Sequence, residues 1–354
     1  MAGCAVAWQA HFRGLDTLLI DRQDRDSSSR VAAGLVTPIT GGRAAASWKW
    51  DDYYSLADVF YRRIERMTGS FFWNVAPAIK VFETTAESDL YHARWMNSEV
   101  MSSAFQPRIR PVSGASCLKG LHTPFEACEM LPSARLDTEN YLRSTHEYFE
   151  RQDAIRFMNL DCEAELDCRS ESIAVRSLGM QATSAILCQG VAARENLFFK
   201  NLPLHPARGD VLQIESKSLR IDQVVHGQGW IVPTGGNRFL VGATYNRSEL
   251  SSDCSDLNLH ALHARDELIQ RWEALVQGSF AAMDHRVVGQ RAAVRPASYD
   301  RHPLIGQHET FDRLYCMNGL GSKGSLMAPG LASTVLDAIH GAQIPSCLDW
   351  KRRR

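Results

Sequence analysis

The sequence predicts a mixed α/β fold, in which a dinucleotide-binding domain is combined with a mainly antiparallel β domain. Three observations lead to this prediction. A small-residue helix followed by an apolar strand opens the chain at residues 2–21. Residues 76–134 and 201–296 read mostly as strands and turns, and an apolar strand, a glycine-rich loop and a helix follow residue 314. Because α/β and β-rich segments alternate, two discontinuous domains explain this order better than two domains in series.

Composition and charge limit the class of protein. The chain has 354 residues, of which 45% are hydrophobic and 22% charged, as in an ordinary globular protein long enough for two domains. The net charge is −1, and the one basic run, residues 351–354, reads as a solvated tail. Nucleic-acid binding is therefore not expected. Since the sequence has no apolar run able to span a bilayer and no signal-peptide pattern, we expect a cytoplasmic protein.

The cysteines predict reduced thiols rather than disulfides or a metal site. Nine cysteines are scattered along the chain, and none belongs to a C-x-x-C pair or to a Cys/His cluster with metal-ligand spacing. They stand at positions 4, 117, 128, 162, 168, 188, 254, 316 and 347. Scattered cysteines of this kind usually act as small core residues in a reducing compartment.

The first 21 residues have the pattern of the second half of a dinucleotide-binding unit. Gly3 stands at the head of a small-residue helix, and the apolar strand at 17–20 ends on Asp21. In such units the last glycine allows close packing of helix and strand, and the acid holds a ribose hydroxyl. The strand and two glycines that normally come before Gly3 are not in the sequence, so we expect a truncation at Met1. Alone, this pattern is not specific.

Further elements follow from periodicity and capping. Leu56, Phe60, Ile64 and Met67 fall on one face of a predicted helix over 51–67 with Gly69 as its C-cap, and strands are predicted next, over 71–73 and 79–82. Asp137 is a good N-cap for a helix over 138–151. Later strands are predicted at 154–158, 173–176, 184–190, 208–214, 287–296 and 314–317, with a hairpin at 230–233 and 239–244 and helices at 257–277 and 326–339.

Four separated segments resemble the D-amino-acid oxidase/glycine oxidase family of FAD-dependent oxidoreductases. They are residues 2–21, 30–35, 294–306 and 319–329. The third, V-R-P-A-S-Y-D-R-H-P-L-I-G, is similar to the R-P-x-[TS]-x-D-x-x-P-x-[IL]-G element of the family. The fourth begins G-L-G-S-K-G, which looks most like the oxidase domain of the bifunctional tRNA wobble-uridine modification enzymes. The third and fourth segments together are more specific than any single glycine motif.

The resemblance implies a domain organisation. Residues 1–75, 135–200 and 297–354 would form a Rossmann-like FAD-binding domain, and residues 76–134 and 201–296 a substrate-binding domain.

The resemblance also implies which residues bind FAD. Glycine loops that open helices, at Gly3 and at 319–324, would supply N–H groups and the positive end of a helix dipole. Ala293 stands where sarcosine oxidases with covalent flavin carry a cysteine, which implies dissociable FAD. The implied cofactor-binding residues are Gly3, Asp21, Arg22, Ala33, Gly34, Leu35, Gly190, Gly319, Gly321, Ser322, Lys323 and Gly324.

For the substrate, the resemblance implies hydride transfer from the carbon beside an amine to flavin N5, with O2 as the electron acceptor. Arg295 aligns with the arginine that holds the substrate carboxylate in glycine oxidases, and a bidentate arginine suits that task. The alternative to substrate binding is a structural role, in which Arg295 forms an ion pair with an acid such as Asp300. Ser322, with Lys323 beside it, stands where glycine oxidases carry a second arginine, which leaves substrate selection open.

Three functions remain open at this point: an oxidase of small amines or amino acids, which we favour; an oxidase of the carboxymethylaminomethyl group of tRNA wobble uridine; and a truncated, flavin-free protein without activity. Trp48, Trp50 and Tyr245 could line a substrate pocket, and His302 lies in a loop, but aromatic residues are more often packing residues. None of these four is assigned a role.

Overall fold

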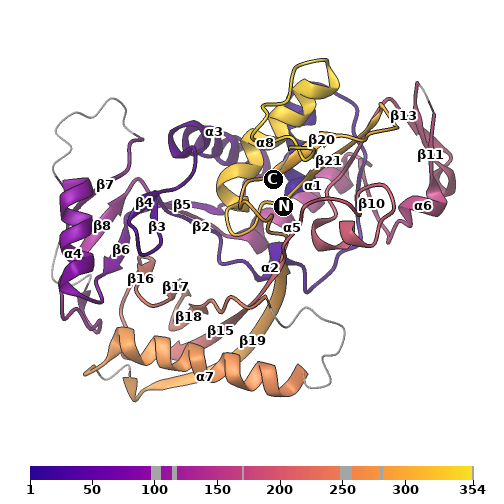
Figure 1. The fold of residues 1–354 in the computed structure, drawn as a ribbon. Helices are drawn as coiled ribbons and strands as arrows, with labels where there is room; N and C mark the ends of the chain where they lie inside the picture. Colours follow the sequence, from indigo (N-terminus) through magenta and orange to yellow (C-terminus); the bar gives the residue numbers. More distant parts are fainter. Residues whose placement is uncertain (97–104, 114–117, 170, 248–256, 280–281, 353–354) are drawn as a thin grey trace.

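The computed structural model describes residues 1–96, 105–113, 118–169, 171–247, 257–279 and 282–352. A large twisted sheet forms one half of the molecule, and helices packed around short parallel strands form the other (Figure 1). The fold class is therefore mixed α/β, as the sequence predicts.

The large sheet has eight strands, and all but one neighbouring pair are antiparallel. The parallel pair is β16 with β6, where Val225 faces Ile79. Helix α7 (Leu257–Val276) lies across one face and buries Trp272 and Leu268 against it (Figure 1). In spatial order the strands are His285–Arg295 (β19), Ala207–Ser216 (β15), Arg238–Gly242 (β18), Trp230–Gly235 (β17), Val225–His226 (β16), Ala78–Val81 (β6), Ala127–Leu131 (β8) and Arg108–Pro111 (β7).

The other half contains two small sheets with parallel strands. In one, Leu19–Asp21 (β1) pairs in parallel with Ile155–Phe157 (β10). In the other, Ala185–Leu187 (β14) runs parallel to Leu314–Asn318 (β21), which pairs antiparallel with Leu304–Gln307 (β20). Four helices pack around these strands: Ala2–Phe12 (α1), Trp50–Thr68 (α3), Thr138–Arg151 (α5) and Gly324–Ile339 (α8).

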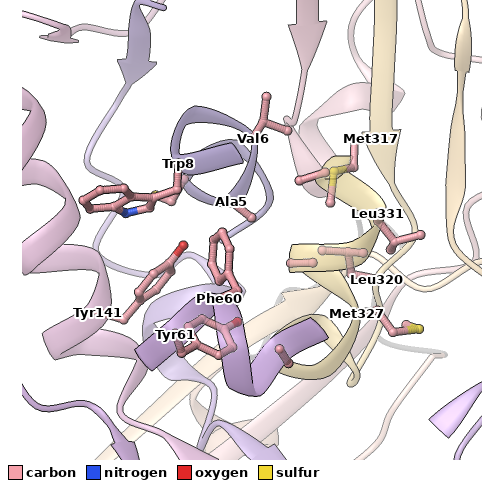
Figure 2. Packing of buried hydrophobic residues seen from close by; sticks show 14 of the residues in the cluster. Ala5, Val6, Trp8, Phe60, Tyr61, Tyr141, Met317, Leu320, Met327 and Leu331 are labelled. Carbon is pink, nitrogen blue, oxygen red and sulfur yellow. The ribbon is translucent and has the colours of Figure 1, made fainter. Parts of the chain in front are cut away.

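The helices meet in an aromatic core. Trp8 of α1, Phe60 and Tyr61 of α3, and Tyr141 of α5 lie on one side of α8 (Figure 2) and share one core cluster with its residues. The rings of Tyr61 and Tyr141 lie edge to face with centroids 5.4 Å apart. Buried edge-to-face pairs add specific contacts to the apolar burial, so this core fixes how α1 and α8 are placed.

Shorter elements connect these parts. They are Ser28–Val31 (α2), Leu35–Val36 (β2), Ile39–Thr40 (β3), Ala45–Ala46 (β4), Trp73–Val75 (β5), Thr85–Tyr91 (α4), Ala134–Leu136 (β9), Cys162–Glu165 (α6), Leu166–Cys168 (β11), Ile173–Val175 (β12) and Met180–Ala182 (β13), with a π-helical turn at His92–Met96 and 3₁₀ turns at Arg176–Leu178 and Gly190–Arg194.

Several predicted elements are confirmed with their caps. Helix α3 ends at Gly69, which has φ 69° in the left-handed region. The side chain of Asp137 accepts a hydrogen bond from the backbone N–H of Asn140 at 3.1 Å and so caps α5. The predicted hairpin is present as β17 and β18, with its turn at Gly235 and Gly236.

Other predictions are wrong in detail. Leu56 and Met67 are 49% and 40% exposed, because the buried face of α3 is formed mainly by aromatic residues and centres on Tyr61 instead. Phe71 is 86% exposed and lies outside the strand, which begins at Trp73. Strand β14 is only partly buried. Helix α4 lies in a region predicted as strands and turns, where Thr84 caps it by accepting from the N–H of Glu87.

The basic C-terminal run is not simply a solvated tail. The guanidinium of Arg352 contacts the carboxylate of Asp300 at 2.6 and 2.8 Å and also donates to the carbonyl of Pro303. Only 14% of the Arg352 side chain is exposed. Arg353 and Arg354 lie outside the described residues.

Every cysteine in the described part of the chain is a free thiol. Cys117 and Cys254 lie outside the described residues. Among the helices that the structure describes, none is long and apolar enough to cross a membrane.

Candidate functional site

A cleft lies where the N-termini of α1 and α8 approach β15 and β19. It holds a cavity of about 210 Å³ within about 1100 Å³ of partly open space. Eight of the residues predicted to bind cofactor or substrate line it: Ala33, Gly34, Leu35, Gly190, Arg295, Gly321, Ser322 and Gly324. Gly3, Asp21, Arg22, Gly319 and Lys323 do not line it.

The N-termini of two helices open onto this cleft side by side. Its lining includes Ala2 of α1 with the N-cap residue Met1, and Gly324 and Ser325 of α8. A Cβ atom built on Gly324 would lie 3.6 Å from Cγ of Met1, so the two first turns are in contact distance. The first N–H groups of a helix have no partner within the helix and carry partial positive charge. The cleft therefore offers backbone donors to an anionic ligand at two points.

The loop that leads into α8 is held by Asn318. Its Nδ2 donates to the carbonyl of Gly190 at 2.8 Å, and its Oδ1 accepts from the N–H of Gly319 at 2.8 Å. Gly319 has φ 71°, and a Cβ there would lie 2.9 Å from Leu304. Gly319 thus shapes the loop from behind the cleft. Asn318 lines the cleft and was not predicted as a site residue, although it directly precedes the glycine loop.

A second wall of the cleft is backbone that passes closely over β9. Gly34 has φ 75°, and a Cβ there would lie 1.7 Å from the carbonyl oxygen of Leu136. The N–H of Leu136 donates a hydrogen bond to the carbonyl of Gly34 at 2.9 Å. No side chain can be placed at this position without moving the backbone. Ala33 and Leu35 on either side line the cleft.

Arg295 crosses the backbone of Gly209. A Cβ on Gly209 would lie 2.2 Å from an Arg295 guanidinium nitrogen, so the absence of a side chain at Gly209 makes room for the guanidinium. Among the described residues, its hydrogen-bond acceptor is the Thr244 carbonyl at 3.3 Å, and its guanidinium lies 5.6 Å from the centroid of the Tyr245 ring. Burial lowers the pKa of Arg295, and nearby Tyr245 and Asp210 act in the opposite direction.

The alternative partner for Arg295 is occupied elsewhere. Asp300 contacts Arg352, which holds the pKa of that carboxyl well below its usual range. Asp210 contacts Arg208 at 3.2 Å. No carboxylate in the described part of the chain forms an ion pair with Arg295, so its guanidinium can receive a ligand carboxylate.

The unassigned aromatic residues lie in different surroundings. Trp50 is in the core and donates to the carbonyl of Phe105. Trp48 stacks on the ring of His302 with centroids 4.7 Å apart. Tyr245 is 53% exposed and contacts Arg295. Trp230, which was predicted only as a strand residue, lines the cleft, and its ring occupies the space beside Gly242.

Lys323 points away from the cleft. Its Nζ donates to Oγ of Ser47 at 3.1 Å, and burial lowers its pKa to about 8. His226 lies near Lys80 and Lys323, and burial together with these two cations lowers the pKa of His226 to about 3. A neutral His226 near these two lysines keeps the local positive charge low.

The predicted ribose acid is engaged by protein groups. Asp21 accepts from the N–H of Gln23 at 2.6 Å, and its other oxygen lies 3.3 Å from Nε2 of His146. Arg22 forms an exposed pair with Asp24. A Cβ on Gly3 would make ordinary contacts with Leu19 at 3.5 Å and with Cys188 at 3.7 Å. Packing of α1 on β1 therefore does not require glycine at this position.

A family described as "FAD dependent oxidoreductase" matches residues 1–338. The chain is 30% identical over 166 residues to the tRNA 5-methylaminomethyl-2-thiouridine biosynthesis bifunctional protein of Thiobacillus denitrificans, covering 47% of this chain and 27% of that protein. It is 26% identical over 195 residues to glycine oxidase of Bacillus licheniformis, covering 52% of this chain and 49% of that protein. The chain thus spans from about a quarter to half of the length of these curated relatives.

Solved structures share the fold. Iminodiacetate oxidase from a Chelativorans species superposes with a TM-score of 0.74 at 18% identity, covering 97% of this chain and 94% of that one. Glycine oxidase from Geobacillus kaustophilus superposes with a TM-score of 0.77 at 16% identity, covering 99% and 96%. At these identities the likeness speaks for the architecture alone.

Proposed function

Because the chain belongs to the family of FAD-dependent oxidoreductases, we propose that it oxidises the C–N bond of a small amine or amino acid that carries a carboxylate, of the glycine or sarcosine type. FAD is the cofactor of this family, and we propose O2 as the electron acceptor. When bound, FAD would accept the hydride from the carbon beside the amine.

The residues of the cleft fit a flat, anionic cofactor. The N-termini of α1 and α8 offer backbone donors to phosphate and to an electron-rich ring edge. The wall at Ala33, Gly34 and Leu35 lies close to backbone without polar side chains in the way, which suits a flat ring. We propose that FAD is bound without a covalent bond, since Ala293 lines the cleft where a nucleophile would otherwise stand.

The position of Arg295 is the observation that carries the proposal. Its guanidinium lies in the cleft over Gly209 and has no carboxylate partner among the described residues. A partly buried arginine in this state can bind a carboxylate through two parallel hydrogen bonds. This binding would orient the amine end of the substrate and would exclude water from the guanidinium, and oxidation then needs no further acid or base if the amine binds neutral.

The same chemistry fits a second candidate substrate. A carboxymethylaminomethyl group on tRNA is also a secondary amine with a carboxylate, and the similarity to the Thiobacillus protein favours it. The net charge of −1 gives no general attraction to RNA. We therefore place the small substrate first.

Hydrogen peroxide release on a panel of amines tests the proposal. We expect turnover with glycine, sarcosine or a related N-substituted glycine, and none with methylamine, which lacks the carboxylate. Arg295→Met should reduce kcat/KM roughly 100-fold, because one charged bidentate contact is lost. Arg291→Met is the matched control, since Arg291 lies on the same strand but donates to the carbonyl of Arg25 outside the cleft.

Two results would change the assignment. Turnover of modified tRNA with silence across the small-molecule panel would favour the second candidate. Equal rates for Arg295→Met and Arg291→Met would contradict the role of Arg295.

Release of free flavin by mild acid would support the non-covalent attachment, and flavin that stays with the denatured chain would contradict it.

A further inference from the structure

Arg135 lies behind the wall of the cleft that residues 33–35 form. It belongs to β9, which pairs antiparallel with β2. The wall lines the cleft, whereas Arg135 does not. Its Nε donates to the carbonyl of Ala33 at 3.3 Å, and another nitrogen of the guanidinium donates to the carbonyl of Pro233 at 3.3 Å. One guanidinium thus joins the wall to β17, the strand that also carries the lining residue Trp230.

The guanidinium of Arg135 carries a charge that no ion pair balances. In the part of the chain that the structure describes, the acceptors of its hydrogen bonds are two uncharged backbone carbonyls. Burial lowers the pKa of Arg135, and nearby Asp137 acts in the opposite direction. The carboxylate of Asp137 itself caps α5 through the N–H of Asn140. Because an arginine side chain stays protonated in proteins, a full positive charge stands behind the wall.

Two carbonyls of the wall point away from the cleft. The carbonyl of Ala32 accepts from Oγ1 of Thr138 at 3.0 Å. The carbonyl of Ala33 accepts from Arg135, and neither Arg135 nor Thr138 belongs to the lining. In a planar trans peptide the N–H group points opposite to the carbonyl. The N–H groups of Ala33 and Gly34 are therefore directed toward the cleft, and neither donates a hydrogen bond within the described chain.

We propose that Arg135 is a positioning residue that raises the electron affinity of a flavin bound in this cleft. Uptake of a hydride adds one negative charge to the flavin ring, so protein groups that stabilise this charge favour the reduced state. The proposal rests on FAD in this cleft, as the proposed function requires.

Arg135 acts on the ring in two ways. It holds the carbonyl of Ala33 backward, which aims the N–H of Gly34 into the cleft and polarises that peptide as a donor. It also places a positive charge behind the wall, where burial strengthens the field of the charge. Both effects favour negative charge on the ring that lies against the wall.

A purely structural role would show a different dependence on charge. If Arg135 served only to hold the wall against β17, a neutral donor would suffice, since both acceptors are carbonyls. If its charge acts on the flavin, only another cation retains the effect. Arg135→Gln keeps a donor without the charge, and Arg135→Lys keeps the charge, so the two variants separate these cases.

The reduction potential of the flavin in the full chain tests the proposal. The protein with FAD bound is reduced in small anaerobic steps by dithionite beside a reference dye, so no amine substrate takes part. In Arg135→Gln the ratio of reduced to oxidised flavin at a fixed dye potential should fall roughly tenfold, a shift of about 30 mV for two electrons. Arg135→Lys should retain most of the ratio.

Two control variants keep charge and packing apart. Arg271→Gln is matched, since Arg271 also donates to a backbone carbonyl, that of Ala243, but is paired with Glu267 and lies outside the lining. Thr138→Val removes a hydrogen bond to the same wall without a change of charge. The ratio should stay as in the unmodified chain in Arg271→Gln and should fall less in Thr138→Val than in Arg135→Gln.

The outcomes separate this proposal from the proposed function. An unchanged ratio in Arg135→Gln, or an equal fall in Arg135→Lys, Thr138→Val or Arg271→Gln, would overturn the role of Arg135 even if sarcosine is oxidised. A fall in Arg135→Gln that Arg135→Lys restores would support this role even if no amine of the panel is oxidised. If Arg135→Gln does not fold, Arg135→Met, which is also neutral, takes its place.

Discussion

The wall of the cleft formed by residues 33–35 and β15 differs from helix α1 in how much room surrounds its glycines. On the wall formed by residues 33–35 and by β15, a Cβ on Gly34 would lie 1.7 Å from the carbonyl oxygen of Leu136. A Cβ on Gly209 would lie 2.2 Å from a guanidinium nitrogen of Arg295. In α1, Gly3 lies next to the lining residue Ala2 but outside the lining, and a Cβ on Gly3 would be 3.5 Å from its nearest neighbour. Of these three positions, the surroundings therefore demand glycine at Gly34 and Gly209 but not at Gly3. A glycine motif in the sequence does not reveal this difference, since all three positions read alike.

The largest effect is expected from Gly34→Ala. The added methyl group would collide with the Leu136 carbonyl, and the residue would also be held at φ 75°. We expect a loss of more than about 3 kcal/mol in the free energy of unfolding. Gly14→Ala separates the two causes, because Gly14 has φ 69° but no atom within 4 Å. Its cost should be about 1 kcal/mol. An equal loss of unfolding free energy in Gly34→Ala and Gly14→Ala, measured by thermal or urea unfolding, would contradict the close approach of Gly34 to Leu136.

The next effect concerns Arg295 and not the stability of the fold. In Gly209→Ala the methyl group would displace the guanidinium of Arg295, which the described contacts hold only through Thr244 and the Tyr245 ring. A displacement of about 1 Å should reduce kcat/KM roughly 100-fold for a carboxylated amine. Steady-state kinetics measure this change. An unchanged kcat/KM would show that Arg295 does not need its present position.

A smaller effect is expected on how the free energy of unfolding depends on pH when Lys323 is replaced. Its pKa is lowered to about 8 by burial, whereas an unfolded lysine titrates near 10.4. Between these values the unfolded chain binds more protons than the folded chain, so stability rises with pH there. The cost of the buried charge is fully present below about pH 8. Relative to Lys323→Met, the unmodified chain should therefore gain stability from pH 8 to pH 10. A constant difference in urea unfolding would contradict the lowered pKa.

The smallest effect is expected from Gly3 in α1. Gly3→Ala adds a methyl group that would make ordinary contacts with Leu19 and Cys188. The free energy of unfolding should change by no more than about 0.5 kcal/mol, since alanine is also the better helix former. A loss of about 2 kcal/mol or more would mean that α1 packs on β1 as tightly as Gly34 packs on Leu136.

Local signals in the sequence predict much of this fold. Asp137 and Gly69 mark helix ends that the structure confirms, because capping depends on residues nearby in the chain. The buried face of α3 was not predictable in the same way. Leu56 is exposed while Tyr61 is buried, because the packing of α1, α5 and α8 determines which face of α3 is covered.

The site residues likewise fall into those that a sequence motif reveals and those that only the tertiary structure brings together. Glycine loops and Arg295 stand in recognisable motifs, so the sequence alone leads to the cleft. Asn318 and Trp230 line it without any such motif. Arg135 stands in no motif either, since β9 brings it from far along the chain to residues 33–35. Contacts of this kind follow only from the tertiary structure.

The central claim is that a carboxylated amine reduces flavin held in this cleft. Anaerobic titration of the purified protein with sarcosine and glycine, followed through the visible absorbance of the flavin, tests it most directly. The account predicts that the band of oxidised flavin disappears with at least one of these amines, and that Arg295→Met needs a much higher amine concentration than Arg291→Met. A protein without a flavin band, or a flavin that stays oxidised with every carboxylated amine, would contradict the account.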